Sequence, residues 1–124
     1  MANEIRLSLG VEITKGYLSY SFNPGQINVD LTTARRGGHI QTIGLTEEDI
    51  DVGDVTSPGL CILRNLDTTN YVTIGPKVGT TNLIEPIIKL KPGQPAVLFL
   101  DPTVTLVAIA NAGAVSLQVD VFEV

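Results

Sequence analysis

The sequence predicts an all-β protein of about eight to ten short strands, either an antiparallel β-sandwich or a jelly-roll-like barrel. Both ends of the chain alternate apolar and polar residues with a period of two, as a strand with one covered face does. Between the ends, short β-rich runs are separated by turn residues. Hydrophobic residues make up 44% of the 124 residues and charged residues 17%, which is atypical of a disordered chain or a long solvated helix.

The alternation at the two ends predicts a half-buried strand at each end. Between Glu4 and Thr14 every second residue is apolar, and Val115 to Val121 shows the same pattern. In an extended chain, side chains two positions apart point to the same face, whereas a helix would spread them around its circumference. The apolar positions are Ile5, Leu7, Leu9, Val11 and Ile13 at one end and Val115, Leu117, Val119 and Val121 at the other.

Two further strands are predicted in the first half, at residues 17–22 and 27–31, separated by the turn signal Asn23-Pro24-Gly25. Arg36-Gly37-Gly38 is expected to break the chain before a strand resumes at residues 39–43. Residues 46–50 combine a capping Thr with acidic residues, which suits either one helical turn or an acidic surface loop. Both interpretations stay open.

The second half predicts strands at residues 60–63, 71–74, 87–91, 96–100 and 104–110. The polar segment 65–70 is expected to form a hairpin loop, so that 71–74 returns antiparallel to 60–63. Residues 91–94 predict a second tight hairpin with a type II turn, because Pro92 fixes φ and Gly93 accepts a positive φ. No linker or repeat divides the chain, so residues 1–124 are expected to form a single β-sandwich domain.

Charge and composition exclude several classes of function. The net charge of −5 argues against nucleic acid and against an anionic membrane as partners, because both are bound through clustered Lys and Arg. One Cys allows no internal disulfide. The first residues lack the basic and apolar stretches of a secretory signal, and no apolar run approaches the length of a membrane helix. A soluble protein made in a reducing cytoplasm is expected.

No catalytic, cofactor-binding or metal-binding residue is predicted. His39 is the only candidate His base and is expected to lie exposed in a loop, with no nucleophile elbow in the sequence. Cys61 lies in an apolar run and is expected to be a small buried hydrophobe. The acids Glu47, Glu48, Asp49, Asp51 and Asp54 lack the order of an EF-hand, so a solvated acidic face is preferred to a weak Ca²⁺ site.

Phosphate and sugar sites are also weakly indicated. Residues 75–81 contain Gly, Lys and Thr, but not in the order of a phosphate-binding loop. Gly37 and Gly38 could form an anion-binding backbone nest beside Arg35 and Arg36, although Gly pairs more often mark turns. Tyr17 and Tyr20 have opposite strand parity and are expected to pack at the rim of the core rather than form a sugar-stacking platform.

The apolar content predicts an assembly. The mean hydropathy is +0.27, and few Lys residues are present to protect the edges of a sandwich from pairing with other chains. We therefore expect some apolar surface and some strand edges to be covered by other chains.

Three segments resemble small structural proteins of tailed bacteriophages. They are Gly53–Gly75, Ile88–Leu98 and Leu117–Glu123, which occur in the same order as in those proteins. The resemblance covers the chain from Gly53 onward, and the first half adds nothing to it. It implies a non-enzymatic virion component with a β-sandwich fold and no catalytic residues.

The resemblance leads to a ranked set of functions. The first is a capsid decoration (cement) protein that binds the outside of the head shell. The second is a tail, collar or fibre accessory protein, and the third is a carbohydrate-binding β-sandwich module. The expected partners are other copies of the chain, with a trimer as the candidate homo-oligomer, and the major capsid or tail proteins. The expected location is the virion, assembled in the host cytoplasm.

Overall fold

The computed structural model describes residues 4–78 and 83–124. Within these residues every regular element is a β-strand and every strand pairing is antiparallel, which confirms the predicted all-β class. The chain, treated as a single domain in the sequence analysis, divides into two compact units. The first comprises the residues up to Thr33 together with Val124, and the second comprises Ala34–Glu123. The two units are described separately.

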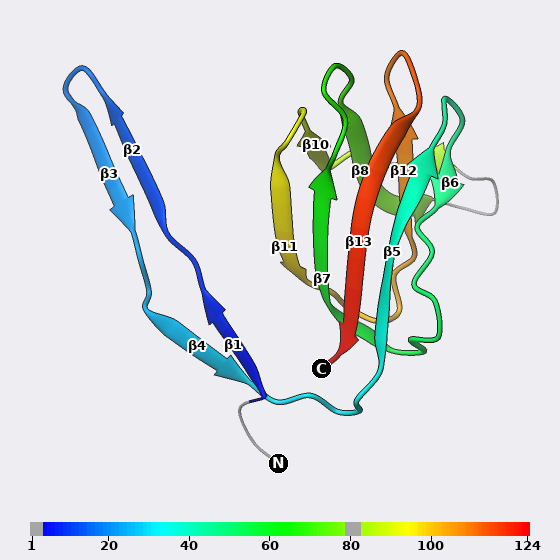
Figure 1. The fold of residues 1–124 in the computed structure, drawn as a ribbon, viewed down its shortest axis with the longest axis horizontal. Helices are drawn as coiled ribbons and strands as arrows, with labels where there is room; N and C mark the ends of the chain where they lie inside the picture. The colour runs from blue at the N-terminus through cyan, green and yellow to red at the C-terminus, as the bar shows by residue number, and fades with distance from the viewer. Residues whose placement is uncertain (1–3, 79–82) are drawn as a thin grey trace. The chain divides into compact units, whose positions relative to one another are not determined.

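The first unit is a long two-stranded ribbon, which we call the arm (Figure 1). Its strands are β1 (Ile5–Ser8), β2 (Val11–Lys15), β3 (Leu18–Phe22) and β4 (Gln26–Val29). The distal part pairs β2 with β3, and the proximal part pairs β1 with β4. The two-residue turn between β2 and β3 begins at Gly16, whose φ of 58° is strained for other residues and suits a tight hairpin.

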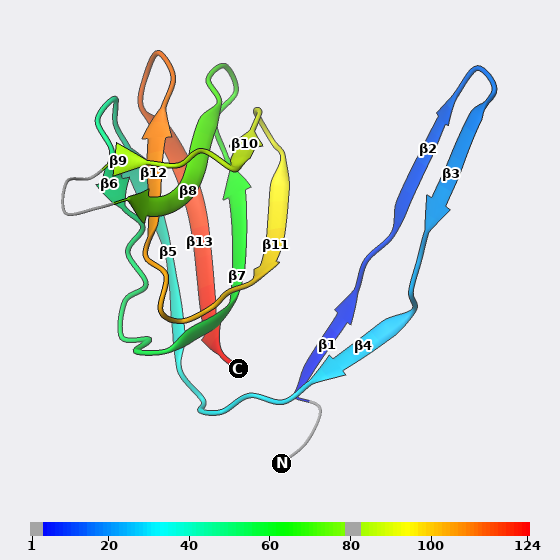
Figure 2. The same ribbon diagram turned by 180° about the vertical axis from the view of Figure 1, so that it is seen from behind.

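The second unit contains two facing antiparallel sheets (Figures 1 and 2). One sheet has the strand order β11-β7-β13-β5, and the other has the order β10-β8-β12-β6, with β9 also paired to β8. The strands are β5 (Arg36–Ile43), β6 (Glu48–Asp49), β7 (Pro58–Asn65), β8 (Val72–Val78), β9 (Leu83–Ile84), β10 (Ile88–Leu90), β11 (Pro95–Phe99), β12 (Leu106–Ala110) and β13 (Val115–Glu123).

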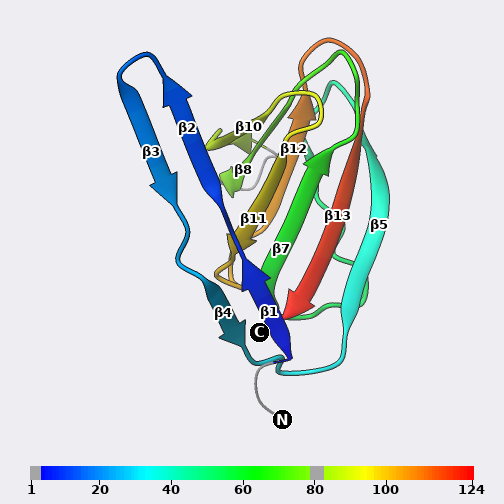
Figure 3. The same cartoon turned by 60° about the vertical axis from the view of Figure 1, so that its left-hand side comes forward.

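The strand order is that of an eight-stranded jelly roll, with β9 as an addition. Apart from β9 the chain passes from one sheet to the other at almost every connection, and only β8 and β10 follow each other within one sheet. Such alternation places strands that are distant in sequence side by side, as β5, β13 and β7 are in Figure 3. Two intertwined Greek keys of this kind define the jelly roll.

The core lies between the two sheets. Val115, Leu117, Val119 and Val121 of β13 are all fully buried, so the predicted C-terminal strand is confirmed. They pack with buried residues of both sheets, among them Leu63 from β7 and Ile74 from β8. The alternation of β13 is therefore explained by one side chain in two entering the core.

The two predicted hairpins are wrong, because each of the loops concerned connects the two sheets. β7 pairs with β11 and β13, whereas β8 pairs with β10 and β12. The turn at residues 91–94 exists, and Gly93 has a φ of 80°, but it joins β10 of one sheet to β11 of the other. The loop after β7 and the turn between β10 and β11 both cross from one sheet to the other. Asn65 forms hydrogen bonds with residues of both connections, which holds the two crossings together.

Two predictions for residues 36–50 are also corrected. Arg36-Gly37-Gly38 does not break the chain, because β5 runs through it and pairs with β13. Glycine is needed at position 37 because a Cβ there would overlap the carbonyl group of Val52. Residues 46–50 contain no helical turn. They include the short strand β6, which pairs with β12, and Glu48 accepts a hydrogen bond from the Gly44 amide at 2.9 Å.

The predicted N-terminal strand exists in two pieces, β1 and β2, separated at Leu9 and Gly10. The expectation that it is half-buried is wrong for β2, where every residue is exposed. In β1, Ile5 and Leu7 are partly buried. The alternation correctly predicts that the ribbon has an apolar face, but the first unit contains no second layer to cover that face.

Candidate functional site

His39 is a strand residue and not the exposed loop residue predicted from the sequence. It lies on β5 opposite Val119 and is partly buried, and its Nε2 atom has no hydrogen-bond partner among the described residues. Near it, Arg36 donates a hydrogen bond to Asp120 at 2.7 Å. Burial opposes ionisation of Asp120, but hydrogen bonds from Gln118 and Arg36 and the charge of Arg36 lower its pKa overall. This group joins β5 to β13 and contains no nucleophile beside the imidazole.

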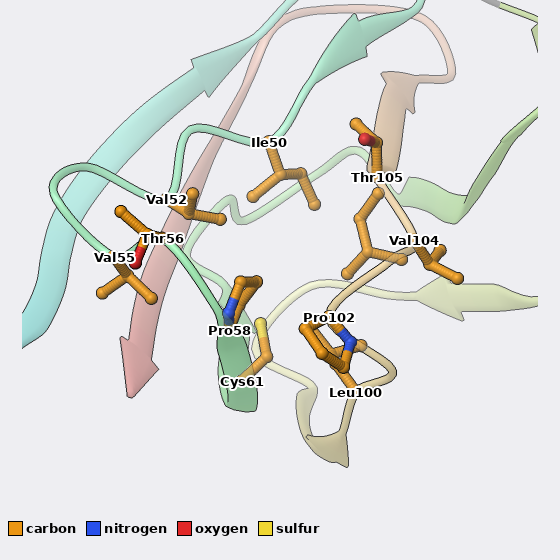
Figure 4. A pocket seen from close by; sticks show the side chains of 11 residues that line it. Ile50, Val52, Val55, Thr56, Pro58, Cys61, Leu100, Pro102, Val104 and Thr105 are labelled. Carbon is orange, nitrogen blue, oxygen red and sulfur yellow. The ribbon is translucent and has the colours of Figure 1, made fainter. Parts of the chain in front are cut away.

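Cys61 is buried, as predicted, and it lines a partly enclosed pocket of the second unit. This cavity of about 210 Å³ is lined mainly by apolar side chains of residues 50–58 and of the connection from β11 to β12 (Figure 4). Burial raises the pKa of the Cys61 thiol to about 12, with a smaller contribution from Asp120. A thiol that stays protonated at neutral pH is a poor nucleophile. The cavity therefore has the character of an incompletely filled core.

The acidic segment does not gather into a cation site. Among residues 4–78 and 83–124, no group of three or more His, Cys, Asp or Glu side chains is placed to hold a metal ion. Asp49 instead pairs with Lys77 at 3.3 Å, and the carboxylate of Asp51 accepts a hydrogen bond from the Gly53 amide. These contacts fix the loop between β6 and β7.

The remaining predicted candidates also have structural roles or fall outside the described part. Gly37 and Gly38 lie in an extended strand, and the guanidinium of Arg36 is bonded to Asp120, so they form no anion nest. Residues 79–81 of the predicted Gly-Lys-Thr segment lie outside the described residues. Tyr17 and Tyr20 are not at the rim of the core, because both are exposed on the arm.

The most unusual surface of the described chain is one face of the arm. In the pairing of β2 with β3, Val11 lies opposite Phe22, Ile13 opposite Tyr20 and Lys15 opposite Leu18. Directly opposed residues of an antiparallel pair share a face. One face of this ribbon therefore carries five apolar residues and a terminal Lys, all of them exposed. We call it the arm face, and it consists of Val11, Ile13, Lys15, Leu18, Tyr20 and Phe22.

The opposite face of the same ribbon is polar. Glu12 lies opposite Ser21, and Thr14 lies opposite Ser19. The proximal ribbon repeats this division, because Ile5 lies opposite Val29 and Leu7 opposite Ile27. The segment Asn23-Pro24-Gly25 adds one residue to its strand relative to the partner strand. That extra residue switches the parity of the apolar positions from even in β3 to odd in β4, and so keeps the apolar residues opposed.

An isolated two-stranded ribbon with a bare apolar face is marginally stable in water. The exposed fractions of Tyr20 and Phe22 are 50% and 43%, although large apolar side chains gain free energy when they leave water. A contiguous surface of this kind is typical of a contact site for another molecule.

The second unit carries an apolar groove at its open side, where β11 forms the edge of one sheet. The groove has a volume of about 310 Å³, and we call it the Phe99 groove. Phe99 is 55% exposed and Ile87 is 72% exposed. Asp101 is the charged residue of the lining. The other lining residues are Gly75, Pro76, Ile88, Leu98, Leu100, Val104 and Leu106.

Comparison with known proteins gives no relative: no family model, curated protein or solved structure matches the chain. Within the described residues, no helix of the length and apolar character required to cross a membrane is present.

The arm as a separate unit was not predicted from the sequence. A signal was available, since two alternating runs flank the pair Gly16-Tyr17 and this arrangement is typical of a two-residue hairpin. The alternation alone could not reveal that the apolar face is exposed, because it records which side is apolar and not what covers that side. The Phe99 groove had no sequence signal, since it is formed by segments that the jelly roll brings together.

Proposed function

We propose that this protein is a non-enzymatic structural protein of a bacteriophage virion, a decoration protein that binds the outside of the capsid. The observation that carries the proposal is the combination of a jelly-roll unit with an exposed amphipathic arm. Jelly rolls are found in viral capsid proteins, and also in lectins and cupins. A fold by itself does not define a function. The choice between these classes of protein therefore depends on the surfaces of this chain.

The surfaces favour binding to other protein chains over catalysis. Within the described part, the candidate reactive groups are a half-buried His in a strand and a buried thiol. The carboxylate near the His, that of Asp120, is engaged by Arg36 and Gln118, and the thiol stays protonated at neutral pH. By contrast, the arm face and the Phe99 groove offer exposed apolar area. The resemblance of the chain from Gly53 onward to phage structural proteins supports the same choice.

The arrangement suits a protein that bridges neighbouring subunits of a shell. Several modest contacts made at once give a total affinity far above that of each contact, since later contacts form at a high effective concentration. A chain with two separate units, each with its own apolar surface, can contact more than one neighbour. The shell then gains resistance to internal pressure from area buried at several interfaces.

Binding to undecorated heads of the phage that carries the gene tests this function. Purified protein should co-sediment with such heads, reach a saturating ratio and raise the temperature at which the heads release DNA. Heads already carrying their full complement are the control and should bind no more. Absence of co-sedimentation, or binding without any gain in thermal or chemical resistance, would contradict a decoration function.

A tail, collar or fibre accessory protein is the second candidate, and the arm also favours it, since tail components join end to end through protruding elements. Cryo-electron microscopy of virions incubated with gold-labelled protein separates the two positions. Label over the head faces supports decoration, whereas label confined to the neck or tail replaces the first proposal by the second.

A carbohydrate-binding module is the third candidate, favoured by the exposed rings of Tyr17 and Tyr20. A glycan array tests whether the chain binds carbohydrate. Binding to a set of related glycans that is lost in Tyr20→Ala would replace the virion proposal, and an array without signal removes this candidate.

A further inference from the structure

The described chain presents two apolar surfaces, one on each unit. The arm face is a flat ribbon surface with two aromatic rings, and the Phe99 groove is a concave surface with a volume of about 310 Å³. Aromatic side chains that enter apolar pockets supply most of the binding energy at many interfaces. Tyr20 and Phe22 on the arm are suited to this role, because they stand on the same face two residues apart.

The backbone of both surfaces is available for pairing. β11 is the edge strand of its sheet and pairs only with β7 among the described strands. β3 pairs only with β2 in the described chain, so its other edge carries unpaired amide and carbonyl groups. Two such edges can add to each other as a continuous sheet, in which backbone hydrogen bonds supply affinity and side-chain pockets supply specificity.

The charges at the two surfaces are opposite. Lys15, at the tip of the arm face, makes no ion pair with any residue that the structure describes. The Phe99 groove has Asp101 as its charged lining residue, two positions after the end of β11, where its Oδ1 atom also accepts hydrogen bonds from Thr103. When β3 runs antiparallel to β11, the tip of the arm lies at the Asp101 end of β11. The same arrangement therefore satisfies strand direction and charge.

We propose that the arm of one copy docks in the Phe99 groove of a second copy, with β3 against the edge of β11 and with Tyr20 and Phe22 in the groove. Each copy supplies both an arm and a groove, so reciprocal exchange or a closed ring covers every such surface without a different protein. This inference goes beyond the proposed function, because it concerns the association of the chain with other copies of itself and not its binding to a head.

Disulfide trapping between differently tagged chains tests the contact and its intermolecular character. One preparation carries Tyr20→Cys with a large tag, and the other carries Leu98→Cys with a small tag, because Leu98 lines the groove and packs toward the core side of β11. After mixing and mild oxidation, a mixed-tag dimer on a non-reducing gel is the expected product. It can form only between an arm and the groove of another copy. The native Cys61 is buried and has a pKa of about 12, so it should not contribute.

The controls use the opposite face of the arm and an exposed apolar residue elsewhere. Ser19→Cys mixed with Leu98→Cys should give roughly tenfold less of the mixed dimer, because Ser19 lies on the polar face. Tyr20→Cys mixed with Ile40→Cys should give as little, since Ile40 is exposed on β5 at the other edge of the sheet. Equal yields in all three mixtures would overturn the proposal as random collision.

The other products identify other occupants, and each overturns the proposal. Dimers linked only through Tyr20→Cys indicate packing of arm on arm. A chain that carries both substitutions and closes only an internal disulfide indicates that the arm folds onto its own groove. Absence of any cross-link under conditions of self-association indicates a different interface.

Sedimentation equilibrium gives an independent measurement that needs no cross-link. The variant Tyr20→Ser/Phe22→Ser should self-associate roughly tenfold or more weakly than the wild type. The matched variant Ser19→Ala/Ser21→Ala, on the polar face of the same strand, should associate like the wild type. Equal association of the two variants overturns the proposal.

The contact and the proposed function fail separately. Protein that binds heads and gives no mixed-tag dimer overturns the arm exchange and leaves the decoration function standing. Protein that gives the mixed-tag dimer and binds no heads supports the arm exchange and overturns the decoration function.

Discussion

Asn65 of β7 donates a hydrogen bond through its Nδ2 atom to the carbonyl oxygen of Leu90 in β10, at 2.9 Å. The two strands belong to different sheets, and Asn65 is fully buried. The same Nδ2 atom also donates to the carbonyl oxygen of Asn70, and the Oδ1 atom accepts a hydrogen bond from the amide of Asp67. One amide side chain thus bonds the loop that follows β7 at two points and also the strand β10 of the other sheet.

Replacement of Asn65 by Ala should destabilise the second unit by about 3 kcal/mol, since buried carbonyl groups lose their donor and each unsatisfied group costs about 1–3 kcal/mol. Urea denaturation followed by circular dichroism measures the change in the free energy of unfolding. Asn28→Ala on the exposed ribbon is the control and should change it by less than about 0.5 kcal/mol. Indistinguishable midpoints for the two variants would show that the buried amide is dispensable.

Gly37→Ala should be strongly destabilising. A Cβ at this position would overlap the backbone carbonyl of Val52, which cannot move aside as a flexible side chain can. Overpacking of this kind typically costs about 1–3 kcal/mol. Gly44→Ala is the matched control, because a Cβ there has no neighbour within 4 Å and the backbone does not require a positive φ. Thermal melts of the two variants give the comparison, and equal melting temperatures would contradict the close approach.

The stability contributed by Asp120 should be lost in acid. Its pKa is lowered in the folded protein, where hydrogen bonds from Gln118 and Arg36 outweigh the opposing effect of burial. The unfolded chain, with a carboxyl pKa of about 3.9, then binds the proton more readily than the folded chain. This contribution is present above about pH 4 and disappears as the pH falls through the folded pKa.

The variant Asp120→Asn tests this dependence. Urea midpoints of the variant and the wild type should differ at pH 7, and the difference should shrink toward pH 3. A constant difference across this range would show that Asp120 acts through its shape and not through its charge.

The thiol of Cys61 should be unreactive in the folded protein. Burial keeps its pKa near 12, so little thiolate exists at pH 8. Reaction with Ellman's reagent should be slow in buffer and rapid in denaturing urea, with one thiol released per chain. Rapid reaction in buffer would mean that the cavity beside Cys61 opens freely to solvent.

The backbone amides of the arm should exchange hydrogen faster than those of β13 in dilute protein. β13 lies between β5 and β7 and contributes four fully buried residues, whereas β2 is exposed throughout and a lone ribbon is marginally stable. At higher protein concentration, the arm amides should become protected if copies associate through the arm. Mass-spectrometric exchange at two concentrations measures this, and protection of the arm equal to that of β13 in dilute solution would contradict it.

The sequence predicted local structure well where a side-chain pattern is compatible with only one backbone conformation. β13, β7 and the turn at Gly93 follow from alternation, from an apolar run and from Pro-Gly chemistry. The prediction failed where a partner decides the outcome. The Gly pair at positions 37 and 38 indicates a break until Val52 and Asp120 are known to approach it, and residues 46–50 become a short strand because β12 is there to pair with it.

The sequence by itself determined that this chain forms strands and that each terminal run has one apolar face, because side-chain direction in an extended chain depends only on position parity. Only the tertiary structure decided which of those faces are covered. Val119 is buried because the jelly roll places a second sheet over β13, whereas Ile13 is exposed because its ribbon has no second layer in its own unit. Burial depends on contacts between residues far apart in sequence, and local periodicity does not predict those contacts.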